Sequence, residues 1–136
     1  MAQYHLSASL IRRSAGRSST AAAAYRAAEA IYDEREGVTH DYRRKDGVVA
    51  AHLMMPDGVS WSPDRETLWS DVEVYNTRRN AQVAREFTIA LPTELEDAQR
   101  EALALRFARE IADQYRIAAD VAIHRPSKDG DQRNHH

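Results

Sequence analysis

Hydrophobic and polar residues alternate in three short stretches of the chain, and this alternation predicts three strands. The stretches are residues 3–10, 85–91 and 118–124. In the first stretch, Leu6 and Leu10 fall on one side, while His5 and Ser7 fall on the other. A period of two is typical of a strand with one buried face in an antiparallel sheet.

Three other segments carry the start signals and the apolar spacing of helices. The predicted helices start at residue 20 or 21, at 62 and at 93, and end near residues 34, 83 and 115. Ser18 offers an N-cap side chain to the first helix, which is rich in alanine. Ser62 precedes a proline at the first position of the second helix. Thr93 and Glu96 have the spacing of a capping box.

Two further strands, residues 38–43 and 48–55, are predicted to form a hairpin around the turn signal Lys45-Asp46-Gly47. The predicted order of elements is therefore β-α-β-β-α-β-α-β. Alternating strands with amphipathic helices indicate an α+β fold, in which a central antiparallel sheet has helices packed mainly on one face.

The composition narrows the class of protein. The chain has 136 residues, of which 43% are hydrophobic and 29% charged, and it has no cysteine. These values suit one folded domain and exclude a disulfide framework or a thiolate metal site. No apolar run approaches the roughly 18 residues that span a bilayer, and the N-terminus lacks the pattern of a signal peptide. We therefore expect a cytoplasmic protein with no stable membrane insertion.

Charge is unevenly distributed, although the net charge is only −2. Residues 1–45 contain eight lysines and arginines against five acidic residues, a balance of +3, and the remainder contains eleven against sixteen, a balance of −5. A basic N-terminal third is compatible with a surface that faces phosphates. It is equally compatible with an ordinary fluctuation in the placement of charges.

The alternating strands would collect polar residues on one face of the sheet if their apolar faces shared a core. These polar residues are His5, Ser7, Ser9, Glu86, Thr88, Asp120 and His124. A solvated face explains the serines and the threonine well. It explains Glu86 and His124 less well, because histidine is an uncommon choice for a plainly wet face.

His135 and His136 form a second histidine cluster at the end of the chain. Together with His124 they could supply nitrogen ligands to a divalent metal. Side chains of adjacent strand residues point opposite ways, so at most one of the pair would join His124. A purification tag and a plain tail are the alternative interpretations.

Tyr25 lies in the middle of an alanine run and is followed by Arg26. A single tyrosine on a helix is usually a packing residue. Here the small neighbours leave space around it, and a phenol becomes a useful nucleophile when its target phosphate is polarised by a metal or a positive group. Tyr25 is therefore a candidate for attack on a phosphodiester.

The chain resembles the MobA/MobL-type plasmid mobilisation relaxases, a family that includes TraA-like conjugative relaxases. The resemblance covers essentially the whole chain in register. It is carried by residues 4–7 (YHLS), 13–19 (RSAGRSS), 21–27 (AAAAYRA), 33–35, 40–42, 44–48, 64–73, 84–87 (AREF), 90–92 (ALP), 119–126 (ADVAIHRP) and 130–134 (GDQRN).

The resemblance implies a relaxase domain of the HUH endonuclease class, with the palm-like sheet of that class. Such enzymes nick one strand at a plasmid origin of transfer through a 5′-phosphotyrosine intermediate, and they rejoin it after transfer. By position, Tyr25 matches the nucleophile, and His124 and His136 match two of three histidines that hold a divalent metal, expected to be Mg or Mn. Glu86 matches a catalytic carboxylate that orients a metal histidine. The third histidine would fall at position 138, so we expect residues 1–136 to be a relaxase domain truncated at its C-terminal end, and the activity of this chain stays open.

The implied partner is origin-of-transfer DNA, single-stranded or in a hairpin. Four arginines are candidates for contacts with its phosphates: Arg12, Arg13, Arg17 and Arg26. Other relaxosome proteins and a secretion coupling protein are implied as further partners. The alternative is an origin-binding module without catalytic activity in this truncated form. Trp61 could stack on bases, whereas the helical spacing of Trp69 favours a place in the core.

Overall fold

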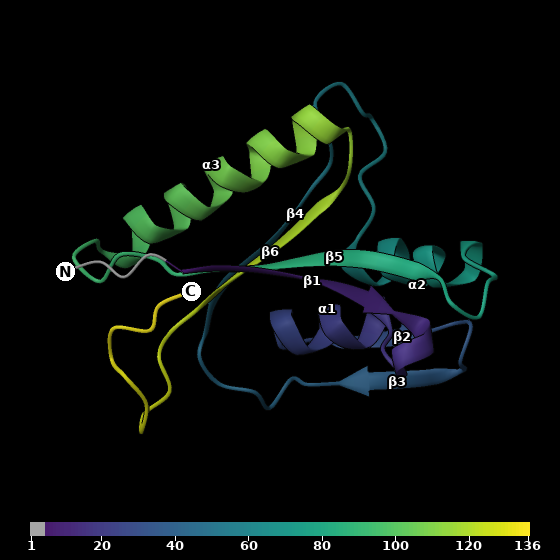
Figure 1. Ribbon diagram of the computed structural model, residues 1–136, viewed down its shortest axis with the longest axis horizontal. Coiled ribbons are helices and arrows are strands. Elements are labelled where there is room, and N and C mark those ends of the chain that lie inside the picture. The colour runs from purple at the N-terminus through teal and green to yellow at the C-terminus, as the bar shows by residue number, and fades with distance from the viewer. Residues whose placement is uncertain (1–4) are drawn as a thin grey trace. The chain divides into compact units, whose positions relative to one another are not determined.

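The computed structural model describes residues 5–136 and contains three α-helices, one short 3-10 helix and six strands within that range (Figure 1). Predicted strand residues 3 and 4 lie outside the described part. In chain order the elements are β1 (Leu6–Arg12), η1 (Arg13–Ala15), α1 (Ser19–Ala27), β2 (Ala30–Asp33), β3 (Val38–Asp41), β4 (Val48–Met54), α2 (Arg65–Tyr75), β5 (Gln82–Ile89), α3 (Asp97–Tyr115) and β6 (Ala119–His124).

The chain divides into two compact units. One, the α1–α2 unit, contains residues 7–46 and 63–88. The other, the α3 unit, contains residues 47–62 and 89–136 together with the described residues up to 6. Each unit has its own helices and strands, so the candidate functional groups fall into two sets.

Helices and antiparallel strands confirm the predicted α+β class. Hydrogen bonding subdivides the described strands into three two-stranded sheets, which are β1 with β5, β2 with β3, and β4 with β6. In the α3 unit, α3 packs against both β4 and β6. In the α1–α2 unit, the two helices pack on each other and on β2.

The first helix starts as predicted but ends early. The Ser18 side chain accepts a hydrogen bond from the Ala21 amide at 3.1 Å, which confirms the N-cap. The helix stops at Ala27, where Ala28 takes a left-handed conformation with φ of 55°. The prediction of helix to residue 34 is wrong, because residues 30–33 pair as a strand and bury Ile31 completely.

The predicted hairpin of residues 38–43 with 48–55 is also wrong. β3 pairs instead with β2, in a hairpin that places Ile31 opposite His40 and turns at Gly37. β4 pairs with β6, with His52 opposite Val121. The turn signal at residues 45–47 therefore marks the passage from one unit to the other.

The other helix starts are displaced by a few residues from the predicted positions. Asp64 is the N-cap of α2 and accepts from the Thr67 amide at 2.7 Å. Glu96 is the N-cap of α3 and forms its capping box with Gln99 rather than with Thr93. Among the described residues, no helix has both the length and the apolar content required to cross a membrane.

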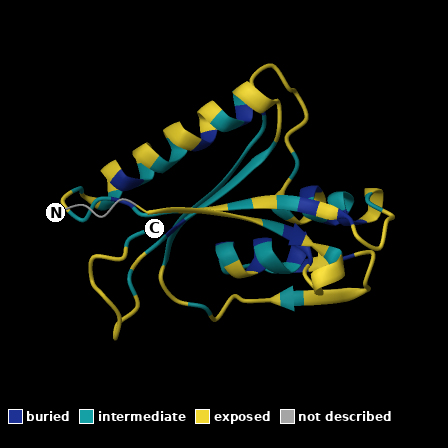
Figure 2. Cartoon of the chain, viewed as in Figure 1, coloured by how far each residue is buried: buried dark blue, intermediate teal, exposed yellow. Residues whose placement is uncertain are grey.

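The α1–α2 unit contains two clusters of buried apolar side chains (Figure 2). One comprises Ile11, Ala81 and Val83, and the other comprises Ala23, Ala24 and Ile31. Trp69 packs against the second cluster, which confirms its predicted place in the core. Alanines on this face of α1 let the helix approach β2 closely, so that Ile31 is fully buried, a contribution of about 1.5–3 kcal/mol.

The apolar faces of the first and fifth strands are less buried than the alternation predicts. Leu6 of β1 and Phe87 of β5 are exposed, whereas Ile11 is buried at the C-terminal end of β1. The difference arises because the apolar partners of β1 lie at its C-terminal end, where Ile11 packs with Ala81 and Val83. In the α3 unit the buried apolar residues are Leu91, Ala108, Ala112 and Ile123.

Candidate functional site

Tyr25 is an exposed residue near the C-terminal end of α1, with 54% of its surface accessible. The Lys45 ammonium lies 3.7 Å from the centroid of the Tyr25 ring, and it donates a hydrogen bond to the Tyr25 carbonyl at 3.0 Å. The Tyr42 ring meets the Tyr25 ring edge-on, with centroids 5.3 Å apart and an interplanar angle of 88°. Tyr25 is thus an exposed phenol with a cation over its ring and not a buried packing residue.

Glu86 joins two of the predicted DNA-contacting arginines. Its Oε1 pairs with Arg26, and its Oε2 pairs with Arg17 at 3.0 Å. The Ser9 hydroxyl also donates to Oε2, at 3.5 Å, which brings together two residues of the predicted polar face, one from β1 and one from β5. Burial alone would raise the pKa of Glu86, but the two guanidinium groups outweigh it and hold the pKa below its usual value.

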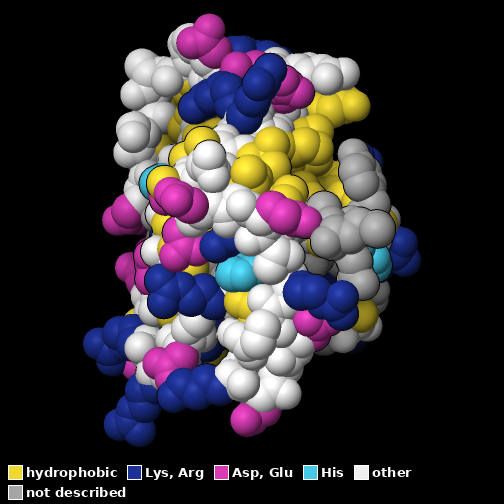
Figure 3. All heavy atoms as spheres, turned by 90° about the vertical axis from the view of Figure 1, so that its left-hand side faces the viewer, with side chains coloured by type: hydrophobic (Ala, Val, Ile, Leu, Met, Phe, Trp, Pro, Cys, Tyr) yellow, Lys and Arg dark blue, Asp and Glu magenta, His cyan; other side chains and the backbone are white. Residues whose placement is uncertain are grey.

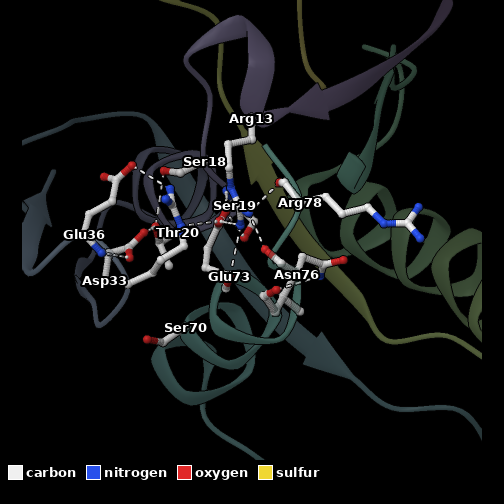
Figure 4. A network of polar contacts seen from close by, with 12 residues as sticks. Arg13, Ser18, Ser19, Thr20, Asp33, Glu36, Ser70, Glu73, Asn76 and Arg78 are labelled. Carbon is white, nitrogen blue, oxygen red and sulfur yellow. Dashed lines mark hydrogen bonds and ion pairs between the residues drawn. The ribbon is translucent and has the colours of Figure 1, made fainter. Parts of the chain in front are cut away.

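Arg13 is held inside the α1–α2 unit by a polar network around Glu73 (Figure 4). Its Nη2 donates to Glu73 Oε2 at 2.8 Å, and its Nη1 donates to the carbonyls of Asn76 and Arg78. The Arg13 side chain is only 12% exposed and that of Glu73 is fully buried. Because both of its terminal Nη groups already bind protein oxygens, Arg13 has a structural role here, and the exposed arginines of the set are Arg12 and Arg17.

Glu73 also fixes the start of α1. Its Oε1 accepts from both the amide and the hydroxyl of Ser19, at 2.6 and 2.9 Å. Burial would raise the pKa of Glu73, but hydrogen bonds from Arg13 and Ser19 outweigh that effect and leave the pKa below its usual value. A charged carboxylate therefore joins η1, α1 and α2 within this unit.

The β2–β3 hairpin contains another group of potential metal ligands, Asp33, Glu36 and His40, whose ligand atoms lie within 4.8 Å of one another. The buried Asp33 carboxylate already accepts from the Thr20 hydroxyl at 2.5 Å and from the Glu36 amide at 2.8 Å. Both contacts are typical of a side chain that closes a turn. Sequence reasoning did not identify this group, because its residues were assigned to the end of a helix and to a different hairpin.

The α3 unit brings His124 and His136 together, as the metal hypothesis requires. The Nδ1 of His124 lies 3.2 Å from the Nε2 of His136, and the two rings meet edge-on at 82°. Their backbones exchange hydrogen bonds, from the His124 amide to the His136 carbonyl at 2.6 Å and in reverse at 3.2 Å. This pairing sets the two side chains opposite each other.

The other nitrogen of the His136 ring, Nδ1, lies 3.2 Å from the Asn134 carbonyl. A proton on Nδ1 satisfies that carbonyl and leaves Nε2 with a free lone pair toward His124. His135 is placed differently: its backbone bridges to Leu91, and burial lowers the pKa of its ring. His136 therefore contacts the His124 ring, while the His135 backbone is held at Leu91.

Two further predicted positions, His5 and Trp61, lie on exposed surface. His5 is exposed and uses its backbone carbonyl to accept from the Ala90 amide at 2.9 Å, and Trp61 is exposed as well. On the face drawn in Figure 3, basic side chains are interspersed with carboxylates and do not form one continuous patch. Positive charge in the α1–α2 unit is partly neutralised by a carboxylate, since Arg17 and Arg26 both pair with Glu86.

Comparison with known proteins identifies the family. Residues 17–136 match the model of the MobA/MobL family. The chain belongs to the MobA/MobL family. It is similar to the mobilization protein MobL of Acidithiobacillus ferridurans, with 54% identity over 126 residues, which is 93% of this chain and 33% of that protein. It is also similar to the conjugal transfer protein TraA of Rhizobium radiobacter, with 37% identity over 135 residues, which is 91% of this chain and 12% of that protein.

A solved structure described as "Molecular Basis of Vancomycin Resistance Transfer in Staphylococcus aureus" is similar to this MobA/MobL chain. The TM-score is 0.87 at 31% identity, and the match covers 95% of this chain and 66% of that one. The chain spans a third or less of the length of the curated relatives named above. The resemblance predicted from the sequence motifs is thus confirmed, together with the fold.

Three residues of this MobA/MobL site were not found from the sequence. Glu73 lies in a helix where a carboxylate is expected at the surface, and Lys45 and Tyr42 lie in a segment interpreted as part of a hairpin. One feature of the sequence could have drawn attention to Lys45: lysine is rare in this chain, which has only Lys45 and Lys128.

Proposed function

We propose that this chain is the relaxase region of a plasmid mobilisation protein, and that it nicks one DNA strand at an origin of transfer with Tyr25 as the nucleophile. The observation that carries the proposal is the Tyr25 site itself, an exposed phenol with Lys45 above its ring. Membership of the MobA/MobL family supports the class of reaction.

In the proposed reaction the Tyr25 phenol oxygen attacks the scissile phosphorus. A bond forms between that oxygen and phosphorus, and the bond from phosphorus to the 3′ oxygen of the preceding nucleotide breaks. The phenol loses its proton and the leaving 3′ oxygen gains one, so the products are a 5′-phosphotyrosine and a free 3′-hydroxyl. The reverse reaction rejoins the strand.

Arg17 and Arg26 are proposed to bind phosphates of the DNA strand near Tyr25. Arg26 follows the nucleophile directly, and both guanidinium groups share the Glu86 carboxylate. A phosphate oxygen offers the same kind of acceptor, so it can replace Glu86 on one or both arginines. Such contacts position the strand without reading its sequence. The predicted role of Glu86 beside a metal-binding histidine stays a proposal.

His124 and His136 are proposed to hold a divalent metal. Two ligands of one cation with bonds of about 2.0–2.1 Å lie roughly 3.0–3.4 Å apart, depending on the coordination angle. The Nδ1 to Nε2 distance of 3.2 Å fits that spacing. When bound, the cation would polarise a phosphoryl oxygen. Nitrogen ligands suit a transition metal better than Mg, so Mn is the better of the two predicted ions.

The proposed substrate is single-stranded or hairpin DNA at the origin of transfer, and other relaxosome proteins and a secretion coupling protein remain predicted partners. An origin-binding module without catalysis is the second candidate. Basic and acidic side chains are mixed on the face drawn in Figure 3, and a few local cations would suffice for contacts with DNA phosphates.

The test uses the native protein that contains these residues and a supercoiled plasmid that carries its coding region with the flanking DNA. With Mn²⁺ we expect conversion of the supercoiled form to the open-circular form. Tyr25→Phe is expected to abolish conversion, whereas Tyr115→Phe, at another exposed tyrosine, keeps it. Nicking by the Tyr25→Phe variant would rule out the nucleophile. DNA binding without nicking by the unchanged protein would favour the second candidate.

A further inference from the structure

Tyr25 is contacted by residues from one short turn, which we call the Tyr42–Lys45 turn. Lys45 caps the ring face at 3.7 Å and also donates to the carbonyl of the same tyrosine at 3.0 Å. Tyr42 meets the ring from another direction, at 5.3 Å between centroids. The Lys45 ammonium therefore contacts Tyr25 twice, once at the ring and once at the backbone carbonyl. Two contacts to the same residue fix Tyr25 more firmly than a single surface contact would.

The Tyr42–Lys45 turn is itself anchored. The Tyr42 amide donates to the Glu29 carbonyl at 3.0 Å, just beyond the end of α1. The Lys45 amide donates to the Tyr42 carbonyl at 2.9 Å. Arg43 is folded back on Asp41 at the end of β3, with a contact of 2.6 Å. The position of the Lys45 side chain is therefore set by the backbone as well as by the ring below it.

We propose that Lys45 is a positioning residue for Tyr25, holding the ring in place and favouring negative charge on its phenol oxygen. This inference rests on the proposed function, in which Tyr25 is the nucleophile. A cation over an aromatic face is attracted by the ring, and the attraction grows as the ring system takes up negative charge. The same contact therefore orients the phenol and assists the loss of its proton.

Charge around Lys45 supports this role. Burial lowers the pKa of the Lys45 ammonium, and the neighbouring Arg26 adds to the effect. The Lys45 charge above the Tyr25 ring and the Arg26 charge thus repel each other, and Glu86 offsets part of the Arg26 charge. An incoming phosphate would relieve that repulsion, so the arrangement favours a phosphodiester at this side chain over a neutral group.

The first test measures the reactivity of each tyrosine without DNA. The protein is labelled with an arylsulfonyl fluoride, and the modified tryptic peptides are quantified by mass spectrometry. Cleavage after arginine places Tyr25 alone in residues 18–26, Tyr42 in residues 36–43 and Tyr115 in residues 110–116. Each tyrosine is therefore measured separately within one sample.

Lys45→Met is expected to slow labelling of Tyr25 about two- to fivefold, the size of a cation–π contribution at a partly exposed site. Lys45→Arg should restore the rate, because a guanidinium keeps the charge and the donor. Lys128→Met serves as the matched control, and labelling of Tyr115 serves as the internal standard. An unchanged or faster rate at Tyr25 in Lys45→Met overturns the proposal.

The second test measures the geometry. With lysine labelled with carbon-13, residues 1–136 contribute signals from two lysines, Lys45 and Lys128. The ring current of Tyr25 should shift the methylene protons next to Lys45 Nζ upfield, and Tyr25→Leu should abolish the shift while Tyr25→Phe keeps it. Equal positions for the Lys45 and Lys128 signals would contradict the contact.

These tests separate the inference from the proposed function. If Lys45→Met slows labelling while Tyr25→Phe still nicks DNA, Lys45 positions a tyrosine that is not the nucleophile. If Tyr25→Phe abolishes nicking while Lys45→Met leaves the rate of Tyr25 labelling unchanged, Tyr25 is the nucleophile and Lys45 does not position it.

Discussion

Glu73 binds Ser19 through both of that residue's polar donors, the backbone amide and the side-chain hydroxyl. The two contacts, at 2.6 and 2.9 Å, use one carboxylate oxygen, and Arg13 takes the other (Figure 4). Glu73 lies in α2 and Ser19 starts the helix that carries Tyr25. The start of the tyrosine helix is thus fixed by a buried charged residue.

Replacing this carboxylate should destabilise the chain strongly. In Glu73→Ala the Arg13 guanidinium and the Ser19 amide lose their partner in a buried setting, at a cost of about 3–5 kcal/mol in the free energy of unfolding. Urea unfolding followed by circular dichroism measures the change. Glu110→Ala, at an exposed pair on α3, should cost less than about 1 kcal/mol. A loss of similar size in both variants would show that the network contributes no stability of its own.

Stability should also depend on pH through the same residue. Because the pKa of Glu73 is below its usual value of 4.5 in the folded chain, its contribution is complete above that pH and is lost as the pH falls through the folded value. Glu86 acts in the same direction. We expect the free energy of unfolding to fall with acidification below about pH 5. Glu73→Gln should flatten this dependence, and an unchanged slope in that variant would contradict the assignment.

Arg17 and Arg26 should carry part of the affinity for DNA. Binding of a fluorescein-labelled single-stranded 30-mer is measured by anisotropy at several salt concentrations. Each of Arg17→Gln and Arg26→Gln should weaken binding and reduce the slope of log affinity against log salt by about 0.7–1. Arg106→Gln, an exposed arginine on α3, is the control and should leave the slope unchanged. Glu86→Gln should strengthen binding, since it releases both arginines.

Metal binding should require His136 and not its neighbour His135. Titration with Mn²⁺, followed by the loss of the free-ion paramagnetic resonance signal, should show weak binding by the chain. His136→Ala and His124→Ala should each abolish it, while His135→Ala should retain it because the His135 backbone bridges to Leu91 and its ring is not part of the pair. Binding should also weaken on acidification, since both rings must be neutral. Retention of binding in His136→Ala would place the metal elsewhere, for example at the Asp33, Glu36 and His40 group.

The helices and strands whose hydrophobic residues recur at a regular spacing were predicted best from the sequence. β6 and α3 were found close to their true limits, and Trp69 was placed correctly in the core. The end of α1 was missed because helix propensity continues past Ala27, whereas the burial of Ile31 in the β2–β3 hairpin decides the structure there. Tertiary contacts of this kind override local preference and leave no local signal.

Some residues of the candidate site could likewise be predicted from the sequence, and others could not. Tyr25, His124 and His136 stand out because these residue types carry chemistry that a surface does not need. Glu73 does not stand out, because a buried carboxylate is recognised only when its partners Arg13 and Ser19 are seen around it. Lys45 reaches Tyr25 across twenty residues of sequence, through a hairpin whose pairing the sequence did not predict.

The most direct measurement of the central claim is the identity of the amino acid that becomes attached to DNA. The native protein that contains these residues is incubated with single-stranded DNA from its origin region and Mn²⁺, digested with nuclease and trypsin, and analysed by mass spectrometry. The account predicts a nucleotide on the peptide of residues 18–26, whose tyrosine is Tyr25. A nucleotide on a peptide that carries another tyrosine, or nicking without any covalent adduct, would contradict it.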